Sequence, residues 1–151
     1  MSATIQVTKH GPRTYSPLSG QTVRGGRLCK FAAGGRIQEA GAGDVLFAGV
    51  ALTDAIAPED VGGTAGTDAW GRPILNTVIK PTTVAVAYGG DEVPVFYTAN
   101  ATQGQLLVAG AAGAVTPVTA DVDPRLIVGR CTQPGGVVFA TNPRGLARLA
   151  I

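Results

Sequence analysis

The chain has few of the side chains that carry out chemistry. Its 151 residues include one His, two Cys and one Trp, and only 15% of them are charged. Nucleophilic catalysis needs a nucleophile that is held beside a base. The single His, His10, lies in a Pro- and Gly-rich segment, and nothing in the sequence places it beside Cys29 or Cys131. The sequence therefore predicts no catalytic triad, and we expect a protein that is not an enzyme.

The two cysteines are far apart in the chain, and neither has a second metal ligand beside it. A free Cys packs as a small hydrophobic side chain, so two buried thiols are the favoured interpretation. A disulfide between them is the alternative, although nothing in the sequence indicates an oxidising compartment. Because the CxxC spacing of metal and redox sites is missing, we expect no metal and no cofactor.

Three pairs of acidic residues are candidates for acid/base chemistry, but their positions favour a role in turns. Each pair lies at a predicted turn, where Asp caps backbone groups and stays solvated. A calcium site needs more oxygen ligands than any of these runs offers. The pairs are Glu59-Asp60, Asp91-Glu92 and Asp121/Asp123.

Long apolar runs are also missing. No stretch approaches the roughly 18 residues that indicate a membrane helix, so we expect no membrane partner. The first residues lack the positive-then-apolar layout of a signal peptide, and nothing in them indicates secretion.

The charged residues are arranged in three blocks. Residues 1–38 carry a charge of +6, residues 39–123 carry −8, and residues 124–151 carry +4. Complementary contact with a neighbouring subunit or an acidic scaffold is one interpretation. A mixed surface is the other, because strands that are distant in sequence pair in space. Nucleic acid is a less favoured partner, since the basic residues are thinly spaced and are not interleaved with stacking aromatics.

Short apolar runs separated by turn residues are what the chain does contain. It has 22 Gly and 10 Pro, and 45% of its residues are hydrophobic. This pattern predicts an all-β fold, a small β-sandwich or β-barrel of about ten short strands. We expect an N-terminal arm over residues 1–20 and a single β domain over residues 21–151, with a long loop at 54–76. The predicted strands cover residues 2–7, 27–31, 36–39, 45–52, 83–88, 92–97, 105–109, 114–118, 126–132, 137–141 and 145–151.

Two of the strand pairs are predicted to be hairpins. Residues 27–31 and 36–39 flank a Gly-Gly turn, which is a hairpin signature. Residues 83–88 and 92–97 flank the turn at residues 89–91 and give the clearest hairpin pattern in the chain. Pro94 cannot donate to a sheet, so its strand is expected at an edge or a bulge.

An internal echo predicts that the domain consists of two related halves. Segments at residues 26–28, 34–37 and 48–51 recur loosely at 104–106, 112–115 and 128–131. The shift between the copies is 78 residues at the start and 80 at the end. Each copy is interpreted as a hairpin followed by a buried strand.

Over roughly residues 20–151 the sequence resembles the tailed-bacteriophage capsid decoration (cement, head-stabilising) proteins. The motifs that carry the resemblance are VRGGRLCKF, RIQEAGAGD, AGVALTDA, TVAVAYGGDEVPV, TQGQLLV, AVTPV, LIVGRC and the terminal LARLAI. The second copy departs from the pattern, because it has Gly129-Arg130-Cys131 where the family often has a Gly-Val-Ala-like run; the insertion at residues 54–76 also looks long.

The resemblance implies a structural virion protein without catalysis. Such a protein is made in the host cytoplasm, binds the major capsid protein on the outer capsid surface and strengthens the shell. It also implies a homo-oligomer, with a trimer as the first expectation. An alternative function of another class is a β-barrel module that binds oligonucleotides or glycans.

The arm and the long loop supply the candidate interface residues. Trp70 either plugs its loop onto the core or anchors an interface, because a Trp on a long loop buries a large area. Tyr15 in the arm has the same two interpretations, with exchange of arms between subunits as the functional one. The candidate residues are Lys9, Arg13, Tyr15, Arg24, Trp70 and Arg72.

Overall fold

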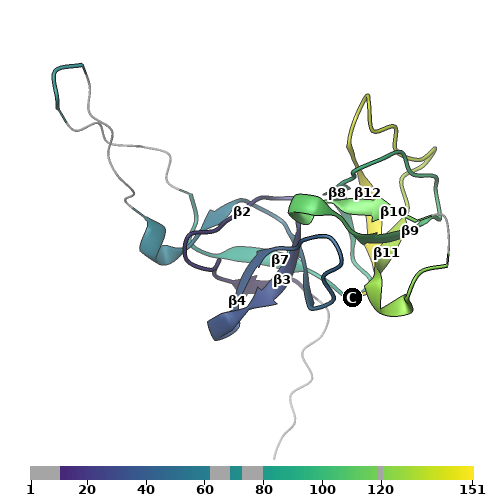
Figure 1. Ribbon diagram of the computed structural model, residues 1–151, viewed down its shortest axis with the longest axis horizontal. Coiled ribbons are helices and arrows are strands. Elements are labelled where there is room, and N and C mark those ends of the chain that lie inside the picture. The colour runs from purple at the N-terminus through teal and green to yellow at the C-terminus, as the bar shows by residue number, and fades with distance from the viewer. Residues whose placement is uncertain (1–10, 62–68, 73–79, 119–120) are drawn as a thin grey trace, which may run out of the picture.

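The computed structural model describes residues 11–61, 69–72, 80–118 and 121–151. Its strands form two five-stranded sheets and one two-stranded ribbon, in which every pairing is antiparallel. The all-β prediction is therefore confirmed. The fold is sandwich-like, and no closed barrel forms among these residues. Figure 1 shows the two larger sheets side by side, the first in purple to teal and the second in green to yellow.

The first sheet belongs to the first half of the chain, residues 11–88, and has the order β1-β7-β5-β3-β4. Its strands are β1 (Arg13–Tyr15), β3 (Leu28–Ala32), β4 (Arg36–Glu39), β5 (Phe47–Ala51) and β7 (Val84–Ala87). The two-stranded ribbon, β2 (Thr22–Val23) with β6 (Ala55–Ile56), lies in the same half.

The second sheet belongs to the second half, residues 89–151, and has the order β10-β9-β11-β12-β8. Its strands are β8 (Glu92–Phe96), β9 (Leu106–Ala109), β10 (Val115–Pro117), β11 (Ile127–Cys131) and β12 (Arg144–Leu149). The 3-10 turns are η1 (Ala33–Gly35), η2 (Pro58–Asp60), η3 (Ala111–Gly113) and η4 (Pro124–Leu126).

The two sheets have the same topology and the same register. In the hairpins, Phe31 pairs with Ile37 and Ala109 pairs with Val115, a shift of 78 residues. Each sheet then has a bulge in the next strand, where Gly49 and Gly129 take equivalent positions 80 residues apart. The echo in the sequence therefore corresponds to two related halves.

The chain just after the edge strand returns to the opposite edge in both halves. Pro17 forms an isolated parallel bridge to Ile37 in the first half, and Tyr97 forms the same bridge to Val115 in the second. The Leu18 and Thr98 N–H groups donate to the carbonyl groups of Ile37 and Val115 at 2.8 and 2.9 Å. These bridges protect sheet edges that would otherwise be open to pairing with other chains.

Each half has a core of small aliphatic side chains, and the halves share part of the second core. The first core includes Val23, Cys29, Ile37 and Val86. The second core also takes up residues of the first half, namely Leu28, Ala40, Val50 and Ala87. The two halves are therefore packed together through buried apolar surface.

Some of the predicted elements are wrong. The strands at 83–88 and 92–97 do not form a hairpin, because β7 pairs with β1 and β5 whereas β8 pairs with β12 in the other sheet. The turn at residues 89–91 thus connects the two halves. In place of the strand predicted at 137–141, only Val137 pairs, through a bridge to Ala101. The edge position of Pro94 is confirmed, since β8 is the last strand of its sheet.

The N-terminal segment is partly integral to the first sheet. Of residues 1–20, Arg13–Tyr15 form β1 and Pro17 bridges β4, so the sheet begins before the boundary that we predicted at residue 21. Residues 1–10, which include the predicted strand at 2–7, lie outside the described residues.

Candidate interaction surface

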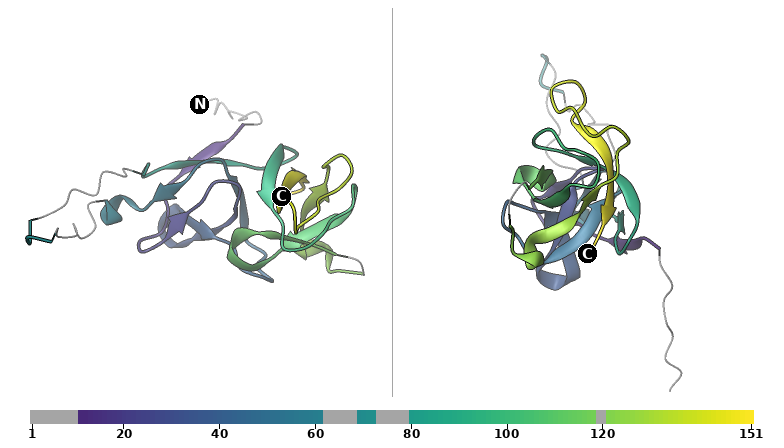
Figure 2. Two further views of the ribbon diagram at one scale, coloured as in Figure 1. Left: turned by 90° about the horizontal axis from the view of Figure 1, so that it is seen from above. Right: turned by 90° about the vertical axis from the view of Figure 1, so that its right-hand side faces the viewer.

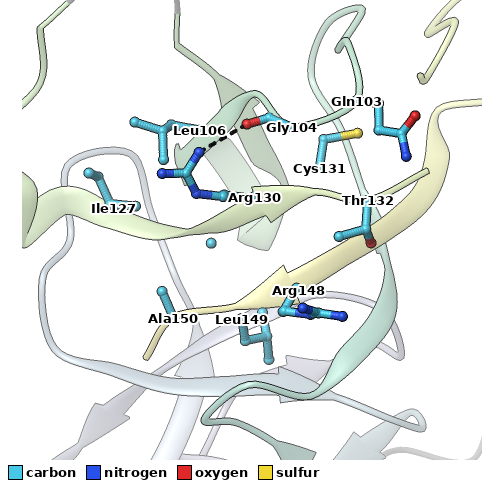
Figure 3. Close-up of a pocket in the computed structure, with 11 residues that line it drawn as sticks. Gln103, Gly104, Leu106, Ile127, Arg130, Cys131, Thr132, Arg148, Leu149 and Ala150 are labelled. Carbon is cyan, nitrogen blue, oxygen red and sulfur yellow. Dashed lines mark hydrogen bonds between the residues drawn. The ribbon is translucent and has the colours of Figure 1, made fainter. Parts of the chain in front are cut away.

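A groove lies on the outer face of the second sheet. It has a volume of about 540 Å³ and is formed by β9, β11 and β12 together with the turn before β9. Figure 3 shows Leu106 and Ile127 at one side of the groove and Arg130 near the Gly104 carbonyl group. We call this site the outer groove; its lining residues are Gln103, Gly104, Leu106, Ile127, Gly129, Arg130, Cys131, Thr132, Arg148, Leu149 and Ala150.

The outer groove is apolar in its lining and basic in its charge. Arg130 and Arg148 lie directly opposite each other on β11 and β12, and both side chains are exposed. The Arg130 guanidinium donates to the Gly104 carbonyl oxygen at 3.3 Å. Arg148 reaches Glu92 only at 4.0 Å, and both of those side chains are substantially exposed to solvent. Exposed pairs of this kind contribute little to stability. The lining itself contains two Arg and no acidic residue.

Elsewhere the charges of the three sequence blocks pair in space. Arg24 holds Glu39 at 2.8 Å and Lys30 holds Asp44 at 3.0 Å. Arg36 pairs with Glu59, and this contact lowers the pKa of the Glu59 carboxyl group. The interpretation as a mixed surface therefore holds for Arg24, Lys30 and Arg36 of the first basic block.

The cysteine side chains offer no reactive group. Cys29 and Cys131 are free and buried, in separate core clusters, which confirms the interpretation as two buried thiols. Burial raises the pKa of the Cys29 thiol to about 12. Within the described part of the chain, no three His, Cys, Asp or Glu side chains come together as metal ligands. The same part contains no helix with the length and apolar character that crossing a membrane requires.

Comparison with solved structures identifies the fold. The head fiber gp8.5 N base of bacteriophage phi29 is similar over 92% of this chain and 94% of its own, with a TM-score of 0.57 and 14% identity. The chain has the fold of the phi29 head-fiber base.

A second similar structure is the pre-mature gene product 12 of phi29, with a TM-score of 0.52 and 18% identity. The similarity covers 98% of this chain but 23% of that protein, so the chain spans about a quarter of its length. No family model matches the chain, and no curated protein matches it.

Within the head-fiber-base fold, the predicted interface residues of the N-terminal segment lie in two places. Arg13 and Tyr15 lie on β1, where the Arg13 guanidinium is 5.8 Å from the Tyr88 ring. Tyr15 packs against the first core and meets the Phe31 ring edge-on at 5.7 Å, so part of this side chain belongs to the core. Arg24 is held by Glu39 through a two-point contact. Lys9 lies outside the described residues.

The two predicted residues of the long loop lie together. The Arg72 guanidinium is 5.2 Å from the centre of the Trp70 ring, and Trp70 is 80% exposed. Residues 69–72 lie at the end of the molecule that is remote from the second sheet (Figure 2). This exposure does not fit the interpretation in which Trp70 plugs its loop onto the core.

The outer groove was not predicted from the sequence, although the internal echo contains an indication of it. The echo aligns Gly49-Val50-Ala51 with Gly129-Arg130-Cys131. Val50 is buried between the halves, whereas Arg130 is exposed. A charged residue at a position that is apolar in the other copy indicates that this face of the second sheet is not covered in the way that the first is.

Proposed function

We propose that this chain is a structural protein of a phage head that binds the outer surface of the capsid and stabilises the shell. The observation that carries the proposal is its similarity to the phi29 head-fiber base along nearly the whole of both chains. The sequence resemblance to capsid decoration proteins supports the same function independently. In this proposal the chain has no catalytic role, and its partners are the major capsid protein and further copies of itself, with a trimer as the expected oligomer.

The architecture suits a protein that adheres. Both halves carry the same sheet, their edges are bridged, and they share a buried apolar contact. Such a body can span the seam between two capsid subunits, and each additional contact area across the seam opposes separation of the subunits. Trp70 on the long loop is the proposed anchor of one contact, because a buried Trp often dominates interface energy.

Sedimentation with shells tests the proposal. Purified full-length chain is mixed with purified capsids that lack it, and the capsids are then pelleted. The proposal predicts saturable co-sedimentation and a higher temperature of capsid disruption after binding. Protein that stays in the supernatant, or that binds without any change in capsid stability, would contradict it.

The alternative of an oligonucleotide- or glycan-binding module receives little support. Stacking platforms for bases use aromatic side chains, and none of the residues that line the outer groove is aromatic.

A further inference from the structure

The outer face of the first sheet is the surface on which the second half is seated. Cys29, Ala51 and Val86 point into the first core. Side chains alternate along a strand, so their neighbours lie on the opposite face. These neighbours are Leu28, Val50 and Ala87, which are at most 3% exposed and belong to the core shared with the second half.

Two close backbone approaches seat the second half there. The Phe96 N–H donates to the Gly26 carbonyl oxygen at 3.2 Å, and the Phe96 ring would lie 3.3 Å from a Cβ atom added to Gly26. At the η3 turn the Gly113 N–H donates to the Ala40 carbonyl oxygen at 2.7 Å. The contact is therefore made by a tight turn and an aromatic side chain that rest on this sheet face and on Arg27. The Arg27 guanidinium donates to the Ala112 carbonyl oxygen at 3.3 Å and lies 4.2 Å from the centre of the Phe96 ring.

The equivalent face of the second sheet is the outer groove, which residues 11–61, 69–72, 80–118 and 121–151 leave uncovered. Leu106 takes the position of Leu28, since Leu28 pairs with Val50 and Leu106 pairs with Arg130; Gly104 takes that of Gly26 by the same shift of 78 residues. The two glycines have similar left-handed φ angles, 86° for Gly104 and 78° for Gly26. A Cβ atom on Gly104 would meet nothing within 4 Å, whereas one on Gly26 would touch Phe96. The second sheet thus presents a similar docking geometry, and none of the residues that the structure describes occupies it.

One register pair on this face differs in charge between the two halves. Val50 and Ala87 form a register pair on the first sheet, and Arg130 and Arg148 form the corresponding pair on the second. Like charges directly opposite each other on neighbouring strands destabilise a sheet. Glu92, opposite Arg148 on β8, approaches only the Arg148 guanidinium, at 4.0 Å. A further carboxylate placed between the two guanidinium groups would remove the repulsion and form charge-assisted hydrogen bonds.

We propose that the outer groove is the docking site for a carboxylate-bearing turn of the capsid subunit. The turn would rest on the apolar lining at Leu106 and Ile127, as η3 rests on the first sheet. Its acidic side chain would lie between Arg130 and Arg148. This inference rests on the proposed function, because it assigns a contact surface and a partner chemistry to it.

A second copy of this chain is a poorer occupant. Its equivalent turn, η1, consists of Ala33, Gly34 and Gly35 and has no carboxylate of its own. The basic residues beside it, Lys30 and Arg36, already hold Asp44 and Glu59. The acidic Glu39 on the same hairpin is already held by Arg24. A small inorganic anion would leave the apolar part of a groove of about 540 Å³ uncovered.

Charge reversal in the groove tests the inference with the full-length chain and capsids that lack it. The variant R130E/R148E should lose at least about tenfold in capsid affinity, and R130K/R148K should retain most of it. The control R125E/R144E makes the same change in net charge at two exposed positions of the second half outside the groove, and it should bind like wild type. Thermal melts of all four proteins confirm that they are folded.

The outcomes separate this inference from the proposed function. Wild-type binding with equal binding of R130E/R148E would overturn the groove assignment and leave the proposed function intact. Equal losses in R130E/R148E and R125E/R144E would show a general charge effect and would also overturn it. Wild-type protein that does not bind capsids would contradict the proposed function and, with it, this inference.

Discussion

Gly129 has no Cβ atom, and this absence allows two neighbouring strands to approach closely. It lies at the bulge of β11, and a Cβ atom there would collide with the Arg148 carbonyl oxygen on β12. Gly49, its equivalent in the first sheet, would collide with the Ala87 carbonyl oxygen in the same way. Glycine at this position therefore permits the close approach of two neighbouring strands in both halves.

Substitution of Gly129 by Ala should destabilise the protein by about 1–3 kcal/mol, because the added methyl group forces the strands apart. Chemical denaturation followed by circular dichroism measures this change. Gly11→Ala is the matched control, since a Cβ atom there meets nothing within 4 Å, and it should leave the free energy of unfolding unchanged. Equal stability of Gly129→Ala and wild type would show that the strands are not in close contact.

The buried Cys29 thiol predicts a loss of stability at high pH. Burial raises its pKa from an ordinary 9.0 to about 12. Above pH 9 the unfolded chain releases this proton while the folded chain keeps it, so stability falls as pH rises from about 9 to about 12. The contribution has a slope of up to about 1.4 kcal/mol per pH unit.

Urea titrations at several pH values, for wild type and Cys29→Ala, measure that slope. The variant should be less stable at neutral pH because it lacks packed atoms, but its stability should decline less steeply above pH 9. Parallel pH dependence of the two proteins would show that the thiol ionises equally in both states.

At the scale of elements, the long loop at 54–76 is present in the first half, and the corresponding connection in the second half is much shorter. Ala55 on β6 and Val84 on β7 are 29 positions apart, whereas their equivalents Val137 and Gly145 are only eight apart. The second sheet forms without such an insertion. The sheet therefore does not require the additional residues, of which Trp70 is exposed.

Trp70→Ala should separate folding from adhesion. Because Trp70 is 80% exposed, its removal should change the free energy of unfolding by no more than about 0.5 kcal/mol. If it anchors an interface, capsid affinity should fall by about tenfold or more. A large loss of folding stability would instead show that Trp70 packs on the core of its own chain.

Strands were easier to predict from the sequence than their partners. The alternating pattern at 83–88 and 92–97 identifies β7 and β8 correctly, and the intervening Gly89-Gly90 favours a hairpin. Their actual partners, β1 and β5 for β7 and β12 for β8, lie far away in the chain. Local periodicity contains no information about such distant pairing. The internal echo does, because a fixed shift between copies predicts equivalent registers.

Distant strand pairing also limited the prediction of the candidate surface. Trp70 was identified from its residue type and its loop, and its exposure agrees with an interface role. The outer groove needs β9, β11 and β12 to be adjacent, and their order follows from the sheet topology. Only the comparison of Val50 with Arg130 across the two copies pointed to it from the sequence.

At the scale of the molecule, the two halves are successive units of one repeat. The second half covers the outer face of the first sheet. Repeat proteins need polar outer faces on their terminal units to remain soluble. Arg130 and Arg148 supply charge where the first half has Val50 and Ala87. We expect them also to disfavour head-to-tail docking of a second copy, which would produce open chains of molecules.

The variant R130V/R148A restores the residues of the first half and should self-associate. Sedimentation velocity should show oligomers whose size grows with protein concentration, on top of any fixed oligomer of the wild type. Gly35 is the equivalent of Gly113 and would seat the docking turn, so adding Gly35→Val should suppress the growth. Unchanged sedimentation of R130V/R148A would indicate that the two sheet faces are not interchangeable.

Cryo-electron microscopy of capsids decorated with this chain tests the central claim most directly. Full-length protein is added to capsids that lack it, and the particles are reconstructed with the capsid symmetry. The account predicts density for the two-sheet body on the outer surface, with the outer groove of the second half facing a capsid subunit. Capsids without added density, or a bound body whose outer groove faces solvent, would contradict it.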